Sequence, residues 1–221
     1  DDSLKNFQKE HNLTIFHLMG QHVNYKQRYR TKQARFWASS YEDKRPELTN
    51  AQRKMLSHYD NATLYNDSIV AQIVKRFQKQ DAIVIYVPDH GEECYEENRG
   101  FICRNHSAEI DWPLAHYEFE IPFWIYCSSK YIKNHRDIYR QIRKAKDKRF
   151  MTDALPHLLL YLAGIETPTY KEEYNILSPK YDEMRPRILK NSADYDKLRD
   201  AHLEKIKKEE SKKVKKKERR N

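Results

Sequence analysis

Polar side chains that can bind metals follow two apolar runs in this sequence. Asp89 and His90 follow Pro88 at the end of the apolar run of residues 83–87, and His22 comes after the apolar run of residues 13–19. A carboxylate and an imidazole both bind divalent metals, and zinc accepts this mixed set of ligands. A metal at such a site polarises a phosphoryl oxygen and lowers the pKa of a bound nucleophile. Asp89 and His90 are therefore candidate metal ligands.

Each candidate also has a purely structural interpretation. Asp89 and His90 could form a hydrogen-bonded pair at the end of a strand, and His22 could bind only the backbone of its own loop. His17 lies inside an apolar run, which is as compatible with a buried, hydrogen-bonded histidine as with a ligand. His106 lies on a loop that we expect to cover the edge of the sheet where Asp89, His90 and His22 lie. It is therefore a candidate for substrate or metal contact.

Acidic residues and further histidines surround these candidates in the sequence. Glu92 and Glu93 either orient His90 without binding the metal themselves, or they are exposed loop acids. We expect the remaining histidines to be structural or solvated: His58, His116, His135, His157 and His202.

Three apolar runs predict the strands that must position the candidate site. Residues 82–87 form an unbroken apolar run, which is typical of a strand buried on both faces of a parallel sheet, and residues 13–19 and 121–127 are two further candidates for buried strands. Residues 49–80 have apolar side chains at a spacing near 3.6 and predict a long helix that Thr49 or Asn50 caps. The first strand, this helix and the second strand read as a βαβ unit.

The predicted fold class is therefore α/β, with a mainly parallel sheet flanked by helices. Ligands of such sheets bind beyond the carboxyl ends of the strands, so Asp89, His90 and His22 are expected at one edge. A second helix is predicted at residues 155–162, capped by Thr152 or Asp153, with Gly164 just past its end.

Length and charge divide the chain into a domain and a tail. Its 221 residues suffice for one domain with an ample core, which we place at residues 1–190, followed by a charged helical or disordered tail at 191–221. The net charge is +9, and Lys205–Arg220 alone carries 10 basic and 3 acidic residues. The tail is either a solvated end or a contact for anionic lipid headgroups.

Compartment signals are few. No apolar segment has membrane-spanning length, and the chain begins with Asp1, so we expect a processed product or a piece whose targeting segment lies upstream. Cys94 and Cys103 flank one loop, and the sequence leaves open whether they form a disulfide.

Five segments, in order and with matching spacing, resemble bacterial phosphoethanolamine transferases over residues 13–165. They are FHLMGQHVNYKQRY (16–29), HYDNATLYNDSIV (58–70), YVPDHGEE (86–93), IPFWIYCS (121–128) and TDALPHLLLYLAGI (152–165). The resemblance implies an alkaline-phosphatase-like domain of the sulfatase superfamily. It also implies zinc-dependent transfer of phosphoethanolamine from phosphatidylethanolamine to lipid A or another envelope glycan. No nucleic-acid partner is expected.

By position, the resemblance makes Asp89 and His90 two zinc ligands. It makes His22 a catalytic histidine that engages substrate or a second metal, and His106 the other such histidine. It also implies a catalytic domain that faces the periplasm, attached to the inner membrane through a segment upstream of this chain.

One departure from the family pattern is large. The nucleophilic threonine of the family, which forms a phospho-enzyme intermediate, and a zinc-binding glutamate lie upstream of the first matched segment, so the chain reads as the C-terminal part of the catalytic domain. A superfamily hydrolase, either a phosphodiesterase or a sulfatase, is the second interpretation. A non-catalytic protein that uses its basic tail on nucleic acid or anionic membrane is the third.

Overall fold

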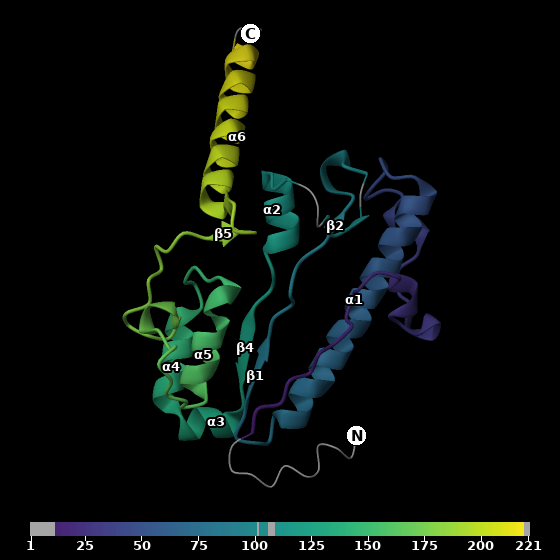
Figure 1. Ribbon diagram of the computed structural model, residues 1–221. Coiled ribbons are helices and arrows are strands. Elements are labelled where there is room, and N and C mark those ends of the chain that lie inside the picture. The colour runs from purple at the N-terminus through teal and green to yellow at the C-terminus, as the bar shows by residue number, and fades with distance from the viewer. Residues whose placement is uncertain (1–11, 101, 106–108, 219–221) are drawn as a thin grey trace. The chain divides into compact units, whose positions relative to one another are not determined.

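The computed structural model describes residues 12–100, 102–105 and 109–218. The chain divides into two compact units, residues 1–70 and residues 71–221 (Figure 1). Helix α1 (Asn50–Phe77) begins in the first unit and ends in the second. Of the described helices, none is both long enough and apolar enough to cross a membrane.

Helix α1 confirms the long helix predicted between residues 49 and 80. Thr49 caps it: the Gln52 N–H donates to Thr49 Oγ1 over 3.3 Å, and the Thr49 N–H donates to Gln52 Oε1 over 2.8 Å. This reciprocal pair is a capping box, which satisfies donors that the first turn leaves unpaired. The buried residues of α1 include the apolar Leu56, Ala62 and Val70.

The strand predicted at residues 13–19 does not form among the described residues. This segment is irregular, and Leu13 and Ile15 are 71% and 80% exposed. An apolar run records a capacity to be buried, but a strand exists only through hydrogen bonds to a neighbouring strand. The predicted βαβ unit is therefore absent from the described chain.

Short 3-10 turns lie between residues 13–19 and α1 in the sequence. Their bounds are η2 (Tyr25–Gln27), η3 (Thr31–Gln33) and η4 (Ala38–Tyr41).

The second unit contains an antiparallel pair of strands, β1 (Ile83–Tyr86) and β4 (Trp124–Cys127). In their register Ile83 lies opposite Cys127, and Tyr86 lies opposite Trp124, whose ring stacks on it at 5.2 Å. Both strands fall within predicted apolar runs. Their pairing is antiparallel, and each of their residues keeps partial exposure, so the described part of the chain forms no parallel sheet buried on both faces.

A helical group packs beside β4 and contains the helix predicted at residues 155–162. Neither Thr152 nor Asp153 caps this helix, because residues 152–154 form a 3-10 turn before it and Ala154 occupies its N-cap position. Its elements are α3 (Ser129–Asn134), α4 (Arg136–Ala145), η6 (Thr152–Ala154), α5 (Leu155–Leu162) and η7 (Glu172–Tyr174). The core of the group is formed by Ala145, Leu158, Ile176 and Leu177. Gly164 follows α5 with φ at +65°, the left-handed conformation that ends helices at a glycine.

The remaining elements surround helix α2 (Trp112–Phe119). The short ribbon of β2 (Glu93–Cys94) and β3 (Ile102–Cys103), with η5 (Glu96–Asn98) between them, precedes α2. Asp111 caps α2 by accepting the Leu114 N–H over 2.9 Å. A second ribbon, β5 (Ile188–Leu189) and β6 (Ala193–Asp194), leads into the long C-terminal helix α6 (Tyr195–Glu218). A core of Ile110, Leu114, Ala115 and Leu189 joins α2 to these elements.

Candidate functional site

The loop after β1 presents Asp89 and His90, at the strand end where the sequence places them. The Asp89 side chain is 88% exposed, and the His90 side chain is 22% exposed. A carboxylate and an imidazole therefore stand together at an accessible point of the second unit.

The backbone of the loop sets the tautomer of His90. His90 Nδ1 lies 2.7 Å from the carbonyl oxygen of Gly91. Because a carbonyl oxygen only accepts hydrogen bonds, Nδ1 carries a hydrogen, and in the neutral imidazole the lone pair is therefore on Nε2. Histidines that bind metals usually have their other ring N–H donated to a carbonyl or carboxylate in this way.

The separation of the two candidate ligands is close to that of two ligands on one metal ion. His90 Nε2 lies 3.7 Å from Asp89 Oδ2, too far for a direct hydrogen bond. Two nitrogen or oxygen ligands on one tetrahedral zinc stand about 3.3 Å apart, given metal–ligand bonds of about 2.0 Å. A shift of a few tenths of an ångström would therefore let both residues bind the same ion. Within the described ranges, no group of three or more candidate ligands is assembled, so this chain shows two ligands of a possible metal centre.

Gly91 supports this loop through a close backbone approach. Its N–H donates to the Glu118 carbonyl oxygen over 2.8 Å, and a Cβ atom at this position would lie 2.3 Å from the Tyr117 carbonyl oxygen. Gly91 is not among the glycines with positive φ, so a glycine is needed here for space against α2 and not for a left-handed turn.

Buried carboxylates lie behind the loop. Glu93 is fully buried, and its Oε2 accepts from Arg99 Nε over 2.9 Å, so the interpretation of Glu93 as an exposed loop acid is wrong. Arg99 also donates to Asp111 over 2.8 Å and thereby ties the β2–β3 ribbon to the start of α2. Burial raises the pKa of Glu118, and the charge of Glu93 raises it further. The sequence signal that could have found Glu118 is its place in the otherwise apolar and aromatic helix α2.

His22 lies in the first unit, on a loop built by the residues that follow it. Arg28 Nε donates to the His22 carbonyl oxygen over 2.9 Å, and its Nη2 donates to the Val23 carbonyl oxygen over 3.1 Å. The imidazole of His22 is exposed. Its catalytic role stays a prediction, because Asp89 and His90 belong to the other unit.

Aromatic contacts fasten the same loop to α1. The Tyr25 ring meets Tyr59 edge-on at 5.3 Å, and the Tyr29 hydroxyl lies 2.8 Å from His58 Nδ1. Burial, with the charges of Lys26 and Lys54, lowers the pKa of His58. His58 is therefore structural, which is one of the two roles that the sequence predicts for it.

Asn61 is a positioning residue that the sequence reasoning missed. Its side chain is 2% exposed, and its Oδ1 accepts the backbone N–H groups of Arg35 and Phe36 over 2.6 and 3.1 Å. Its Nδ2 donates to the carbonyl oxygens of Phe36 and Ser57 over 2.8 and 2.7 Å. The signal was an amide among apolar positions of the α1 face, within the matched segment at residues 58–70.

His17 and His106 are the two remaining histidine candidates. His17 is exposed, so its interpretation as a buried histidine is wrong. His106 lies outside the described residues, and its role stays a prediction.

Comparisons with known proteins give the family of this chain. The sulfatase family model matches residues 1–165. Phosphoethanolamine transferase EptC of Escherichia coli O18:K1:H7 is 32% identical over 174 residues, which cover 77% of this chain and 29% of the relative. Kdo(2)-lipid A phosphoethanolamine 7''-transferase of Escherichia coli K12 is 31% identical over 140 residues, which cover 62% of this chain and 23% of the relative.

A solved structure shows the same fold. The C-terminal periplasmic domain of EptC from Escherichia coli, in complex with zinc, has a TM-score of 0.64 and 28% identity. The match covers 81% of this chain and 50% of that domain, so the chain spans about half of the solved domain. The predicted resemblance to phosphoethanolamine transferases is confirmed, and the chain belongs to the sulfatase family of enzymes.

Proposed function

We propose that this chain is the C-terminal part of the catalytic domain of a zinc-dependent phosphoethanolamine transferase. The donor is phosphatidylethanolamine, and the acceptor is lipid A or another envelope glycan. The domain faces the periplasm, and a segment upstream of this chain attaches it to the inner membrane.

The arrangement of Asp89 and His90 carries this proposal. The Gly91 carbonyl holds Nδ1 of His90, so the lone pair on Nε2 stands 3.7 Å from an exposed carboxylate oxygen of Asp89. Zinc bound by these two atoms would supply Lewis-acid polarisation of the phosphoryl oxygen. The relatives named for phosphoethanolamine transfer and the zinc complex of the solved neighbour support this choice of metal and reaction.

Other residues complete the proposed site. His22 contacts the transferring group or a second metal, held in place by Arg28 and the aromatic contacts of its loop. His106 has a similar role. The nucleophilic threonine and a zinc-binding glutamate come from sequence upstream of residue 13, where the family carries them.

We also infer that the complete domain contains a mainly parallel sheet. The apolar segment 13–19 has exposed side chains and no strand partner among the described residues, and β1 and β4 are only half-buried. Strands from the upstream half would cover these surfaces. Slower amide hydrogen exchange at residues 13–19 in the longer protein than in this chain would support that inference.

The test of the metal site uses Asp89→Ala and His90→Ala in the longer protein that contains this chain. Both variants should lose zinc, measured by elemental analysis, and should lose transfer to a lipid acceptor. Asp147→Ala, which removes an exposed carboxylate elsewhere in the same unit, is the matched control and should keep both. Full activity of either site variant would end the proposal.

His22→Ala separates substrate contact from zinc binding. Transfer should fall while the zinc content stays at the level of the parent protein. Loss of the zinc would instead make His22 a primary ligand.

Product analysis distinguishes transfer from hydrolysis. Other members of the sulfatase family carry out hydrolysis, so the family match leaves this reaction as the second candidate. Transfer yields a modified acceptor, whereas hydrolysis yields free phosphoethanolamine and no modified acceptor.

A further inference from the structure

Helix α6 has an anchored beginning. Tyr195 and Leu198 pack against the core around α2, and the His202 ring stacks on Trp112 at 5.3 Å. Asp196, in the first turn, accepts two hydrogen bonds from Arg187 and one from Arg149. These contacts fix the direction of α6 relative to the rest of the second unit.

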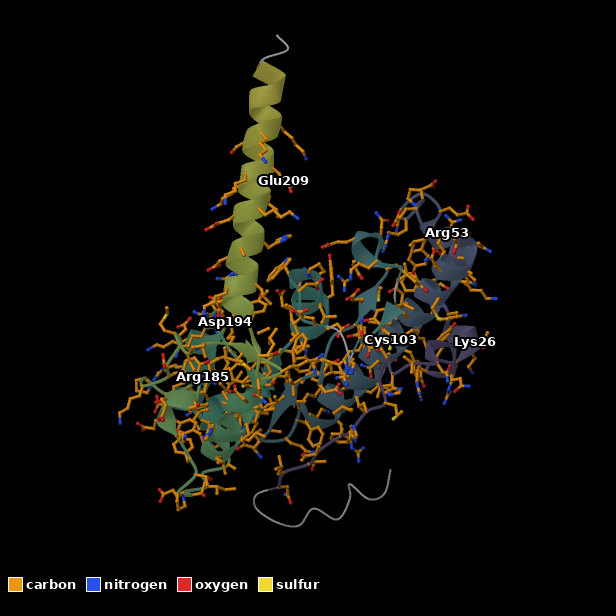
Figure 2. The ribbon with its side chains drawn as sticks, turned by 45° about the horizontal axis from the view of Figure 1, so that its top comes forward. Lys26, Arg53, Cys103, Arg185, Asp194 and Glu209 are labelled. Atoms are coloured by element: carbon orange, nitrogen blue, oxygen red, sulfur yellow. The ribbon has the colours of Figure 1, made fainter. Side chains whose placement is uncertain are left out.

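The following stretch, residues 203–213, has exposed side chains at every position. Figure 1 shows α6 running on past the end of α2, and Figure 2 shows the side chains around Glu209 pointing outward from the helix. Residues 203–213 therefore form a helix that the described part of the second unit does not cover.

The charges of α6 form a stripe. Lys205, Lys208 and Lys212 recur at intervals of three and four residues, so they share one helix face. The same spacing continues in the sequence at position 216, which makes the series about 16 Å long at a rise of about 1.5 Å per residue. We call Lys205, Lys208 and Lys212 the lysine stripe.

The lysine stripe faces outward with most of its charge uncompensated. Lys208 Nζ lies 3.7 Å from a Glu204 oxygen, while Lys205 and Lys212 have no carboxylate within ion-pair distance among the described side chains. The sequence from Lys205 to Arg220 has a net charge of +7. This part of the helix carries most of the excess positive charge of the chain.

The positions of the apolar residues on α6 indicate which kind of surface the helix can bind. Leu203 and Ile206 are partly exposed, but helical spacing places both of them away from the lysine stripe. Helices that insert into a bilayer need an apolar face, and the stripe offers none. Basic segments without an apolar face bind anionic headgroups at the membrane surface through charge alone.

We propose that the lysine stripe of α6 binds the surface of an anionic lipid membrane. The choice of lipid over other polyanions rests on the proposed function, because a transferase that acts on a lipid must work beside a membrane. The anchored first turns of α6 then hold the second unit, with Asp89 and His90, close to that surface. The family model ends at residue 165, so α6 lies outside the matched family region.

Vesicle flotation with the full 221-residue chain tests the proposal. The chain should float with vesicles of phosphatidylcholine and phosphatidylglycerol, and not with phosphatidylcholine alone. Binding should fall steeply as salt rises from about 50 to about 200 mM, because the contact is screened by ions. Equal flotation with both vesicle types would overturn the proposal.

Two double variants give a matched comparison on one helix. Lys205→Gln with Lys212→Gln removes two charges from the stripe and should weaken binding about 25-fold, or about fivefold per lysine. Lys207→Gln with Lys213→Gln removes two charges from other faces of α6 and should weaken binding less than about fivefold. Equal losses in the two variants would show that net charge, and not the stripe, governs binding. Circular dichroism checks that both variants stay helical.

Two further measurements distinguish binding to lipid from binding to nucleic acid and from the function of the zinc site. Tighter binding of the chain to a short DNA duplex than to anionic vesicles at equal salt would overturn the assignment to lipid. Asp89→Ala should float like the parent chain, because surface binding needs no zinc. Loss of transfer in Asp89→Ala and loss of flotation in the stripe variant would thus be independent results.

Discussion

The carbonyl oxygen of Tyr117 occupies the space beside Gly91, 2.3 Å from where a Cβ atom would stand. Helix α2 and the loop that carries Asp89 and His90 can approach this closely only because residue 91 has no side chain. The geometry of the candidate metal ligands therefore depends on a contact with a helix more than 20 residues later in the sequence.

Gly91→Ala should destabilise the fold and disturb the site together. A methyl group against a backbone carbonyl forces the loop to move, and such overpacking costs about 1–3 kcal/mol. Urea unfolding measures the free energy, and zinc titration of the longer protein measures the site. Gly164→Ala, which strains a positive φ at the end of α5, should lower stability while leaving zinc affinity unchanged. Unchanged stability in Gly91→Ala would show that the loop is free to move.

Asn61→Ala should release the loop at residues 35–36 from α1. The substitution leaves two backbone N–H groups without the Oδ1 acceptor, and each buried unpaired group costs about 1–3 kcal/mol. We expect a loss of about 2–4 kcal/mol in the free energy of unfolding and faster proteolysis near residue 35. Asp67→Ala changes an exposed position of the same helix and should alter stability by less than about 0.5 kcal/mol.

Glu118→Gln should stabilise the fold at neutral pH. Burial, and then the charge of Glu93, raise the pKa of Glu118 above its ordinary value of 4.5, so the folded state holds the proton more strongly than the unfolded state. Stability from this group is therefore full below pH 4.5 and is lost as the pH rises through the folded pKa. Glutamine keeps an oxygen for the Asn105 N–H and has no proton to lose. Urea unfolding below pH 4.5 and at pH about 7 should show a gain only at the higher pH.

Asp196→Asn should loosen the start of α6. Hydrogen bonds from Arg187 lower the pKa of Asp196 below its ordinary value of 3.8, so its stabilising effect is present above pH 3.8 and is lost as the pH falls through the folded pKa. Because the group is partly exposed, we expect a loss of about 1–2 kcal/mol at neutral pH. The difference from the parent chain should shrink in acid. Asp200→Asn, at a more exposed carboxylate of α6, is the control and should have little effect at either pH.

The sequence by itself determined the elements whose signals are local. Thr49 and Gln52 start α1, Gly164 ends α5, and the apolar run before Asp89 contains β1. Capping residues, helical spacing and β-branched runs act over a few neighbours, so they can be recognised without knowing the rest of the fold. The order of the matched segments indicated the family, while the assignment of Asp89 and His90 as metal ligands stays a prediction.

Tertiary structure alone decided how these elements are partnered. Residues 13–19 are apolar enough for a strand, yet they form none here, because strand hydrogen bonds require a neighbour. The antiparallel pairing of β1 with β4, the burial of Glu93 and Glu118, and the space for Gly91 all depend on residues distant in sequence. Contacts between distant segments leave no periodic signal in the chain, so their partners became visible only in the folded structure.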